Sequence, residues 1–358
     1  LKLSCVVFLL IAVSCAGDDE PLVNSSTPGT PPVNTVDTTL VPMQIYFGTM
    51  HAHTKYSDGS GTPAEGYAWA RDVAKMDYYT ITDHAEYLFG DEFSSIGVQA
   101  GIFTQNGSFV AMRGFEWSGA EGHMNVYNFN ELRSTVFYPT EQLFFSSLEK
   151  TDAIIQLNHP GYIGASLHNV AYYPSGAATT SAIETGNDNF GNNSGVYIDY
   201  YDTALGNGWK VGPTNNLDNH SLIDNKHRTV ILAEELTESA LLNAFAARRI
   251  YSTDDPDIKI RFRYKNNWMG AVVKKTGGIK FDITIEDNEP IKKIELITNH
   301  RQVAASVSFT ETTNSYTWQP ELTVGSKSYY YVKVTSLNLF EADMDEQIAL
   351  TAPIWFNY

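Results

Sequence analysis

The order of hydrophobic and polar positions changes twice along the chain. From Met43 to about Asp255, short apolar runs with strand character alternate with runs of helical period. This alternation predicts an α/β architecture around a parallel sheet. The expected strands are Gln44–Phe47, Tyr78–Thr82, Phe109–Arg113, Met124–Phe129, Ala153–Leu157, Ala182–Thr185 and Val196–Asp199. The expected helices are Pro63–Lys75, Glu141–Lys150 and Glu238–Arg249, the last of them capped by Thr237.

After Pro256 the helical period disappears. Alternating or β-branched runs follow one another at Ile258–Tyr264, Ile279–Ile285, Lys292–Thr298, Ala304–Thr310, Tyr316–Gln319, Tyr329–Ser336 and Gln347–Phe356. Short strands at this spacing are typical of an antiparallel β-sandwich. We therefore predict an α/β domain over residues 43–255 and a small all-β sandwich domain over residues 256–358.

The start of the chain has a different pattern. An apolar run, Val6–Val13, follows Lys2 and is too short to span a bilayer, so it predicts a signal peptide. Cys15 comes directly after Ala12-Val13-Ser14, which resembles a bacterial lipobox, and residues 1–15 are therefore expected to be a lipoprotein signal peptide. The alternative is an ordinary cleaved signal in which Cys15 is incidental.

The segment after Cys15 is polar. Residues 16–42 are rich in Ser, Thr, Pro and Gly and are expected to form a flexible linker. Its acidic start, Asp18–Glu20, resembles the tags that route some lipoproteins to the cell surface. The expected location is extracytoplasmic, with a lipid anchor on Cys15 in a bacterial outer membrane and exposure at the cell surface.

Charge and cysteine content narrow the chemistry. The formal net charge of −17 argues against nucleic acid as a partner, because binding phosphates requires an excess of Lys and Arg. Both cysteines, Cys5 and Cys15, precede the α/β segment. The folded part therefore has no thiolate ligand, no cysteine nucleophile and no disulfide.

Histidines and acids gather where the expected strands end. His51 and His53 follow the first strand, and residues two apart on extended chain point the same way. The whole set is His51, His53, Asp58, His84, Glu116, His123, His159, Asp218 and His220. In a parallel barrel the carboxyl ends of the strands open onto one face, so these side chains are expected to converge.

The types of ligand predict the metals. Imidazole nitrogens and carboxylate oxygens without sulfur suit divalent Zn, Mn or Fe. Six histidines and three acids are too many for one tetrahedral ion, so two or three divalent ions are expected. A single histidine of this kind is more often a satisfied core residue, and the joint pattern is what favours metal. His168, His227 and His300 fit no ligand position and are expected at the surface.

The order of these residues resembles the PHP (polymerase and histidinol phosphatase) superfamily. The motifs around Tyr46–Thr54 and Ala247–Tyr251 are similar to its extracytoplasmic branch, which includes carbaryl-hydrolase-like proteins. The resemblance covers about residues 43–255 and implies a distorted seven-stranded β/α barrel with a two- or three-metal site. It implies that Glu116 is the bridging carboxylate and that the other eight residues are the remaining ligands. Asn216-Leu217 stand before Asp218 where the family often has a small residue, which affects the local loop.

Other charged residues lie near the ligands in the sequence. Asp83 precedes His84 and is expected to orient its imidazole, with direct ligation as the alternative. Lys55 and Arg113 could bind a phosphate oxygen or be solvated surface residues. Glu116, Asp83 and Lys55 are the candidate catalytic residues.

Together these features predict a metal-dependent hydrolase. The preferred reaction is hydrolysis of a small-molecule phosphoester by a metal-bridging hydroxide. One alternative is hydrolysis of a carbamate, amide or other ester on the same metals, which the scarcity of Lys and Arg near the ligands keeps open. Another is a surface glycan-binding lipoprotein with a non-catalytic metal site, against which the complete ligand set argues.

Overall fold

The computed structural model describes residues 41–162, 167–187, 196–339 and 346–358. Residues Thr39–Tyr358 form one compact unit. The predicted signal peptide, with Cys5 and Cys15, and nearly all of the predicted linker lie outside the described residues. Within the described part of the chain, no helix is both long and apolar enough to cross a membrane.

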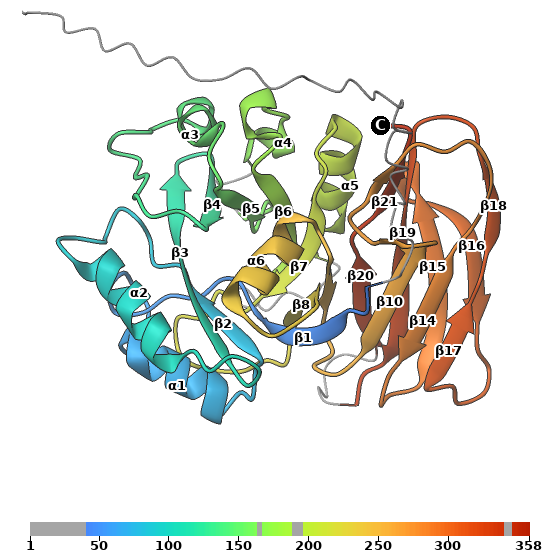
Figure 1. The fold of residues 1–358 in the computed structure, drawn as a ribbon, viewed down its shortest axis with the longest axis horizontal. Helices are drawn as coiled ribbons and strands as arrows, with labels where there is room; N and C mark the ends of the chain where they lie inside the picture. Colours follow the sequence, from blue (N-terminus) through green and yellow to red (C-terminus); the bar gives the residue numbers. More distant parts are fainter. Residues whose placement is uncertain (1–40, 163–166, 188–195, 340–345) are drawn as a thin grey trace, which may run out of the picture. The chain divides into compact units, whose positions relative to one another are not determined.

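A curved sheet forms the first part of the fold (Figure 1). Its strands are β1 (Gln44–Thr49), β2 (Tyr78–Ile81), β3 (Val110–Gly119), β4 (Gly122–Tyr127), β5 (Ile154–Asn158), β6 (Thr180–Asn187), β7 (Gly212–Asn216), β8 (Arg228–Ala233) and β9 (Ile250–Thr253). Their order is β9-β8-β1-β2-β3-β4-β5-β6-β7. The fold is thus mixed α/β as predicted, but the sheet has nine strands in this part of the chain, and the expected count of seven is wrong.

The sheet is not purely parallel. β1 pairs with β2 and β2 with β3 in parallel, whereas β4 is antiparallel to both β3 and β5. The connection between β3 and β4 is only Ala120 and Glu121, which is too short for the crossover that a parallel strand needs. The start of β4 therefore lies at the edge where β3 ends, and His123 pairs with Ser118.

The sheet curls, so that β6 and β7 at one end of it are hydrogen-bonded through side chains to β8 and β9. In β8, the Thr229 hydroxyl accepts from the backbone N–H of Asn215 at 3.1 Å and donates to the Asn215 carbonyl at 3.1 Å. The Thr185 hydroxyl of β6 donates to Ser252 Oγ of β9 at 2.9 Å. Thr185, Thr229 and Ser252 are all buried, so polar side chains close this part of the sheet.

Helices connect the strands. Their bounds are α1 (Pro63–Asp72), α2 (Glu92–Phe103), α3 (Glu141–Leu148), the short left-handed turn α4 (Leu167–Val170), the 3-10 turn η1 (Pro174–Gly176), α5 (Ile198–Asn207) and α6 (Glu238–Ala246). Thr62 and Glu65 close a capping box on α1, and Thr237 caps α6 as predicted. Helix α2 was not foreseen.

The strand predicted at Val196–Asp199 is wrong, because Ile198 begins helix α5. The buried residues of α5 are Tyr201, Ala204 and Leu205, which follow the spacing of one helical face. Gly208 ends the helix in the left-handed conformation at φ 108°. The local run Val196-Tyr197-Ile198 has strand propensity, but the longer helical period determines the structure.

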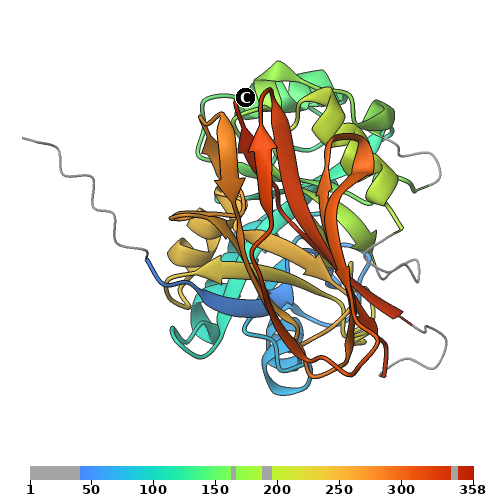
Figure 2. The ribbon, with the colours of Figure 1, turned by 90° about the vertical axis from the view of Figure 1, so that its right-hand side faces the viewer.

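Strands dominate the described residues after Pro256 (Figure 2). They are β10 (Lys259–Tyr264), β11 (Asn267–Trp268), β12 (Val272–Val273), β13 (Gly277–Lys280), β14 (Asp282–Glu286), β15 (Ile291–Thr298), β16 (Gln302–Ser308), β17 (Ser315–Trp318), β18 (Glu321–Val324), β19 (Ser328–Leu337), β20 (Glu346–Thr351) and β21 (Ile354–Phe356), with the 3-10 turn η3 (Asn299–Arg301). One four-stranded sheet has the order β11-β10-β14-β17. Its residues Phe262 and Ile283 share a buried cluster with Ile294 and Val332 of β15 and β19.

The second group of strands continues the curved sheet. β20 pairs antiparallel with β9, with Leu350 opposite Ser252. The backbone of the all-β part is therefore hydrogen-bonded to the last strand of the α/β part. A division into two domains at residue 255 stays a prediction.

Candidate metal centre

The structure brings all nine predicted ligands together. They come from chain segments at one edge of the curved sheet: after β1 (His51, His53, Asp58), after β2 (His84), within β3 (Glu116), at the start of β4 (His123), after β5 (His159) and after β7 (Asp218, His220). His123 reaches this edge because β4 runs antiparallel to β3. Their role as ligands stays a prediction.

Glu116 lies at the centre of the cluster and is almost completely buried. Its two carboxylate oxygens lie 2.8–3.5 Å from ring nitrogens of five histidines, which are His51, His53, His84, His123 and His159. The Asn158 amide also donates to Glu116 Oε1 at 2.8 Å. Five imidazoles around one buried carboxylate form a donor set with the chemistry that divalent ions bind.

The spacing between ligand atoms fits shared ions. His51 Nε2 and His53 Nε2 are 3.1 Å apart, and Asp218 Oδ1 lies 3.3 Å from the first and 3.1 Å from the second. Two atoms bound to one ion at about 2.1 Å, at tetrahedral or octahedral angles, are about 3.0–3.4 Å apart. The three side chains therefore have the separation expected of ligands on one ion.

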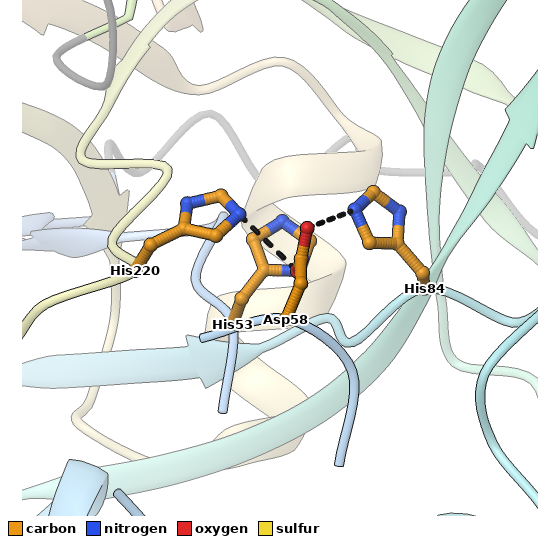
Figure 3. Close-up of side chains that lie close together, drawn as sticks. All are labelled: His53, Asp58, His84 and His220. Atoms are coloured by element: carbon orange, nitrogen blue, oxygen red, sulfur yellow. Dashed lines mark ion pairs between the residues drawn. The ribbon is translucent and has the colours of Figure 1, made fainter. Parts of the chain in front are cut away.

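Asp58 gathers a second group of histidines (Figure 3). Its carboxylate oxygens lie 3.3 Å from His220 Nε2, 3.5 Å from His84 Nε2 and 3.8 Å from His53 Nδ1. The Asp58 side chain is 49% exposed, in contrast to the buried Glu116. This group therefore lies at the solvent-facing side of the cluster, where a substrate could enter.

Three groups of potential ligands overlap. They are His53/Asp58/His84/His220, His51/His53/Glu116 and His84/Glu116/His123. A neutral imidazole has one lone pair on nitrogen and serves one ion, whereas a carboxylate has two oxygens and can bridge. Glu116 belongs to two of the groups and is the residue whose chemistry permits sharing.

Opposite charges in the cluster shift one another's pKa values. Burial would raise the pKa of Glu116, but His51, His84 and His123 hold it well below its usual range. Burial would lower the pKa of His84, but Glu116 and Asp58 raise it to about 11. Ions that bind here must displace protons from such imidazoles, so binding strengthens as pH rises.

Glu184 is a member of the site that the sequence did not reveal. This buried residue of β6 accepts from five donors, with His51 Nδ1 at 2.9 Å and the His159 backbone N–H at 2.7 Å among them. A carboxylate that accepts from the far nitrogen of an imidazole fixes the ring and leaves the other nitrogen for a metal. Glu184 sits within a strand, and the only signal was one acid in the apolar run Ala182–Thr185.

The hydrogen bonds of Asp83 are to the loop after β1. Its carboxylate accepts from the Thr54 backbone N–H at 2.6 Å, the Thr54 hydroxyl at 2.7 Å and the Ser57 hydroxyl at 2.5 Å. Ser57 Oγ in turn lies 3.3 Å from His53 Nδ1. His84 Nδ1 instead lies 2.5 Å from Ser118 Oγ. Asp83 therefore holds the loop that carries Asp58 and reaches His53 through Ser57.

The two candidate cations differ in their surroundings. Arg113 stacks 4.0 Å over the Phe93 ring and donates to Phe93 O and Asn130 Oδ1, so its guanidinium is engaged with α2 and the loop after β4. Lys55 is exposed on the loop of Asp58, and its backbone N–H donates to Gly61 O. Of these two cations, Lys55 is therefore the one that lies on the loop of the solvent-facing group.

The three histidines expected at the surface do not all lie there. His300 is exposed, and His168 is half-exposed between Glu121 and Glu141. His227 is buried, so that expectation is wrong for it. Burial, and then the charge of Arg228, lower the pKa of His227 to about 4.

Comparison with known proteins gives little further guidance. No protein-family model and no curated protein matches the sequence. Among solved structures, the chain is similar to a two-domain protein from Bacteroides vulgatus ATCC 8482 that is described as containing a predicted PHP-like metal-dependent phosphoesterase. The TM-score is 0.49 and the identity 17%, over 87% of this chain and 95% of the other. Membership of the PHP superfamily stays a prediction from the sequence motifs.

Proposed function

We propose that this protein is a metal-dependent hydrolase that uses two or three divalent ions held around Glu116. The observation that carries the proposal is the buried Glu116 carboxylate with histidine nitrogens on both of its oxygens. A structural ion needs a closed shell of four ligands, whereas nine potential ligands with an exposed side at Asp58 suit a reactive centre.

The chain's own residues would hold and orient the reacting groups. Divalent ions at such a site supply an activated water and neutralise charge that builds up on the substrate. Glu184 fixes the ring of His51, and Asp83 fixes the loop that positions Asp58. Lys55, on the same loop, would attract an anionic substrate towards the exposed side.

We propose a phosphoester as the substrate class, on the strength of the sequence motifs. The engagement of Arg113 with Phe93 and Asn130 favours the second candidate, a carbamate, amide or carboxyl ester, because phosphate chemistry usually recruits arginine. The test is protein purified without a metal-chelating tag, analysed for bound metal and assayed on phosphomonoesters, phosphodiesters, carbamates and carboxyl esters. Hydrolysis that chelation abolishes and Zn, Mn or Fe restores supports the proposal, and a metal-free protein inactive on the whole panel contradicts it.

An exposed tyrosine, Tyr87, lies beside the histidine cluster and predicts an effect on substrate affinity. Tyr87 is 53% exposed and packs edge-on against His84 with ring centroids 5.8 Å apart. Tyr87→Ala should raise KM about 3- to 10-fold and leave kcat within about 2-fold, because the ring contacts substrate without holding an ion. Phe89→Ala, at an exposed residue of the same loop, is the matched control. A Tyr87→Ala protein with wild-type KM on every accepted substrate would exclude this contact.

We also propose that a lipid on Cys15 anchors the protein. Wild type should partition with outer membranes, and Cys15→Ala should appear in the periplasm or medium, since the proposed anchor is the lipid on Cys15. Cys5→Ala, within the predicted signal peptide, is the control and should partition as wild type. Equal partitioning of Cys15→Ala and wild type would refute the anchor. Fractionation with immunoblotting measures both.

A further inference from the structure

A second group of acids lies outside the histidine cluster. Asp255 and Asp257 belong to the connection between β9 and β10, and Asp287 and Glu289 to the connection between β14 and β15. Each offers one carboxylate oxygen, and these four oxygens all lie within 4.8 Å of one another. We call these four residues the joint cluster, because both connections run between the curved sheet and the four-stranded sheet.

Three acids of the joint cluster are buried and Asp257 is partly buried, and none has a cationic partner among the described residues. The exposed fractions are 1% for Asp255, 8% for Asp287 and 6% for Glu289. None of the four acids takes part in an ion pair among the described residues. Lys259 borders the same surface cavity of about 380 Å³ as Asp257 and Asp287, but it is exposed and forms no ion pair with them in the described structure. Buried like charges of this kind are strongly unfavourable unless a cation or protons neutralise them.

Two buried carboxylate oxygens of the joint cluster accept no hydrogen bond from the described residues. Glu289 Oε2 is buried and has no hydrogen-bond partner among the described residues, and the same is true of Asp257 Oδ1. Other oxygens are held in place: Ser336 Oγ donates to Asp287 Oδ2 at 2.5 Å, and the backbone N–H groups of Asp257 and Ile258 donate to Asp255 Oδ1. The carboxylates are therefore oriented by the fold while at least two oxygens lack a donor.

We propose that the joint cluster binds one Ca²⁺ ion. The donor set is oxygen alone, which hard cations prefer, whereas the histidine cluster around Glu116 offers nitrogen as well. Calcium binds oxygen at about 2.4 Å, and the four oxygens lie within 4.8 Å of one another, so all four can contact one ion. Magnesium requires about 2.0–2.1 Å and usually keeps several waters, so four convergent carboxylates fit it less well.

The site would stabilise the connection between the two parts of the fold. Its ligands come from two connections that are about thirty residues apart in sequence, so one ion ties the chain after β9 to the turn before β15. An ion at this position would also neutralise carboxylates that the fold holds close together.

The test is thermal unfolding of the full chain in metal-depleted buffer, with CaCl₂ or MgCl₂ added at equal concentrations up to 10 mM. We expect Ca²⁺ to raise Tm by about 4–8 °C, Mg²⁺ to raise it less, and calorimetric titration to give one Ca²⁺ per chain. Absence of any Ca²⁺-dependent shift and of bound Ca²⁺ would overturn the proposal.

Variants distinguish Ca²⁺ binding at the joint cluster from a general effect of ionic strength and from binding at the histidine cluster. Without Ca²⁺, Glu289→Gln should have a Tm equal to or above that of wild type, because it removes like-charge repulsion. With Ca²⁺ the Tm of Glu289→Gln should be below that of wild type. Asp287→Asn should behave in the same way, provided that its circular-dichroism spectrum shows that it is folded. Glu311→Gln, at an exposed acid, and Glu116→Gln should both keep the wild-type Ca²⁺ shift. If the difference between Glu289→Gln and wild type is independent of Ca²⁺, the joint cluster holds protons and not an ion.

Discussion

Glu116→Gln should lower kcat/KM on the best substrate by at least about 10³-fold, which corresponds to about 4 kcal/mol of transition-state stabilisation. The carboxylate has histidine nitrogens 2.8–3.5 Å from its two oxygens, so it is placed to give each of two ions a negatively charged ligand. An amide of the same shape is neutral, and its NH₂ group would face imidazole nitrogens that must themselves bind metal. The ions should separate or be lost, and the water between them should become less acidic.

The fold should survive this substitution. Gln has nearly the volume of Glu, and the buried apolar clusters of the sheet do not depend on the charge. Glu121→Gln is the matched control, since Glu121 lies half-exposed at the tip of the same β3–β4 hairpin. Steady-state kinetics, metal analysis and circular dichroism on both variants are the measurements. Wild-type turnover by Glu116→Gln would mean that another acid, Asp58 or Asp218, is the bridge.

The sequence was sufficient to predict which nine residues converge, because their positions follow a local rule. His51, His84 and His159 come directly after short apolar runs, and the ends of neighbouring strands in a sheet are close in space. His123 obeyed the same logic for a different reason, since the two-residue hairpin reverses β4 and puts its first residue at that edge. Residue type and position relative to the strand were therefore enough to predict which residues converge, although the predicted number of strands was wrong.

Features that depend on distant contacts could not be predicted in the same way. The polar strand β7, Gly212–Asn216, has no hydrophobic alternation because its Asn215 and Asn216 hydrogen-bond to Asp254 and Glu184 inside the fold. Likewise, His227 is buried next to Asp254, a residue that follows β9 and is distant from His227 in the sequence. The pairing of β20 with β9 joins residues almost a hundred positions apart, which no periodicity within a strand can indicate.

Glu184→Gln is expected to weaken metal binding about 10- to 100-fold. Glu184 accepts on Oε1 from His51 Nδ1, Asn216 Nδ2 and Gln156 Nε2, and on Oε2 from the His159 N–H and Asn187 Nδ2. A glutamine has a single acceptor oxygen, so its NH₂ group must face two or three of these donors. His51 would lose its orienting carboxylate and its ring would be free to turn, which misplaces the nitrogen that faces Glu116 and Asp218.

This residue acts through His51, so the pattern of loss should differ from that of Glu116→Gln. At limiting metal, kcat/KM of Glu184→Gln should fall about 10- to 100-fold, and added metal should restore most of it because the ligands themselves remain. Glu141→Gln is the matched control, since Glu141 is equally buried and accepts from His168 and Tyr173 outside the histidine cluster. Titration of the metal-depleted proteins, followed by activity and by calorimetry, separates the two variants. If excess metal restores nothing while the affinity for metal is unchanged, Glu184 takes part in the reaction itself, and the positioning role assigned to it is wrong.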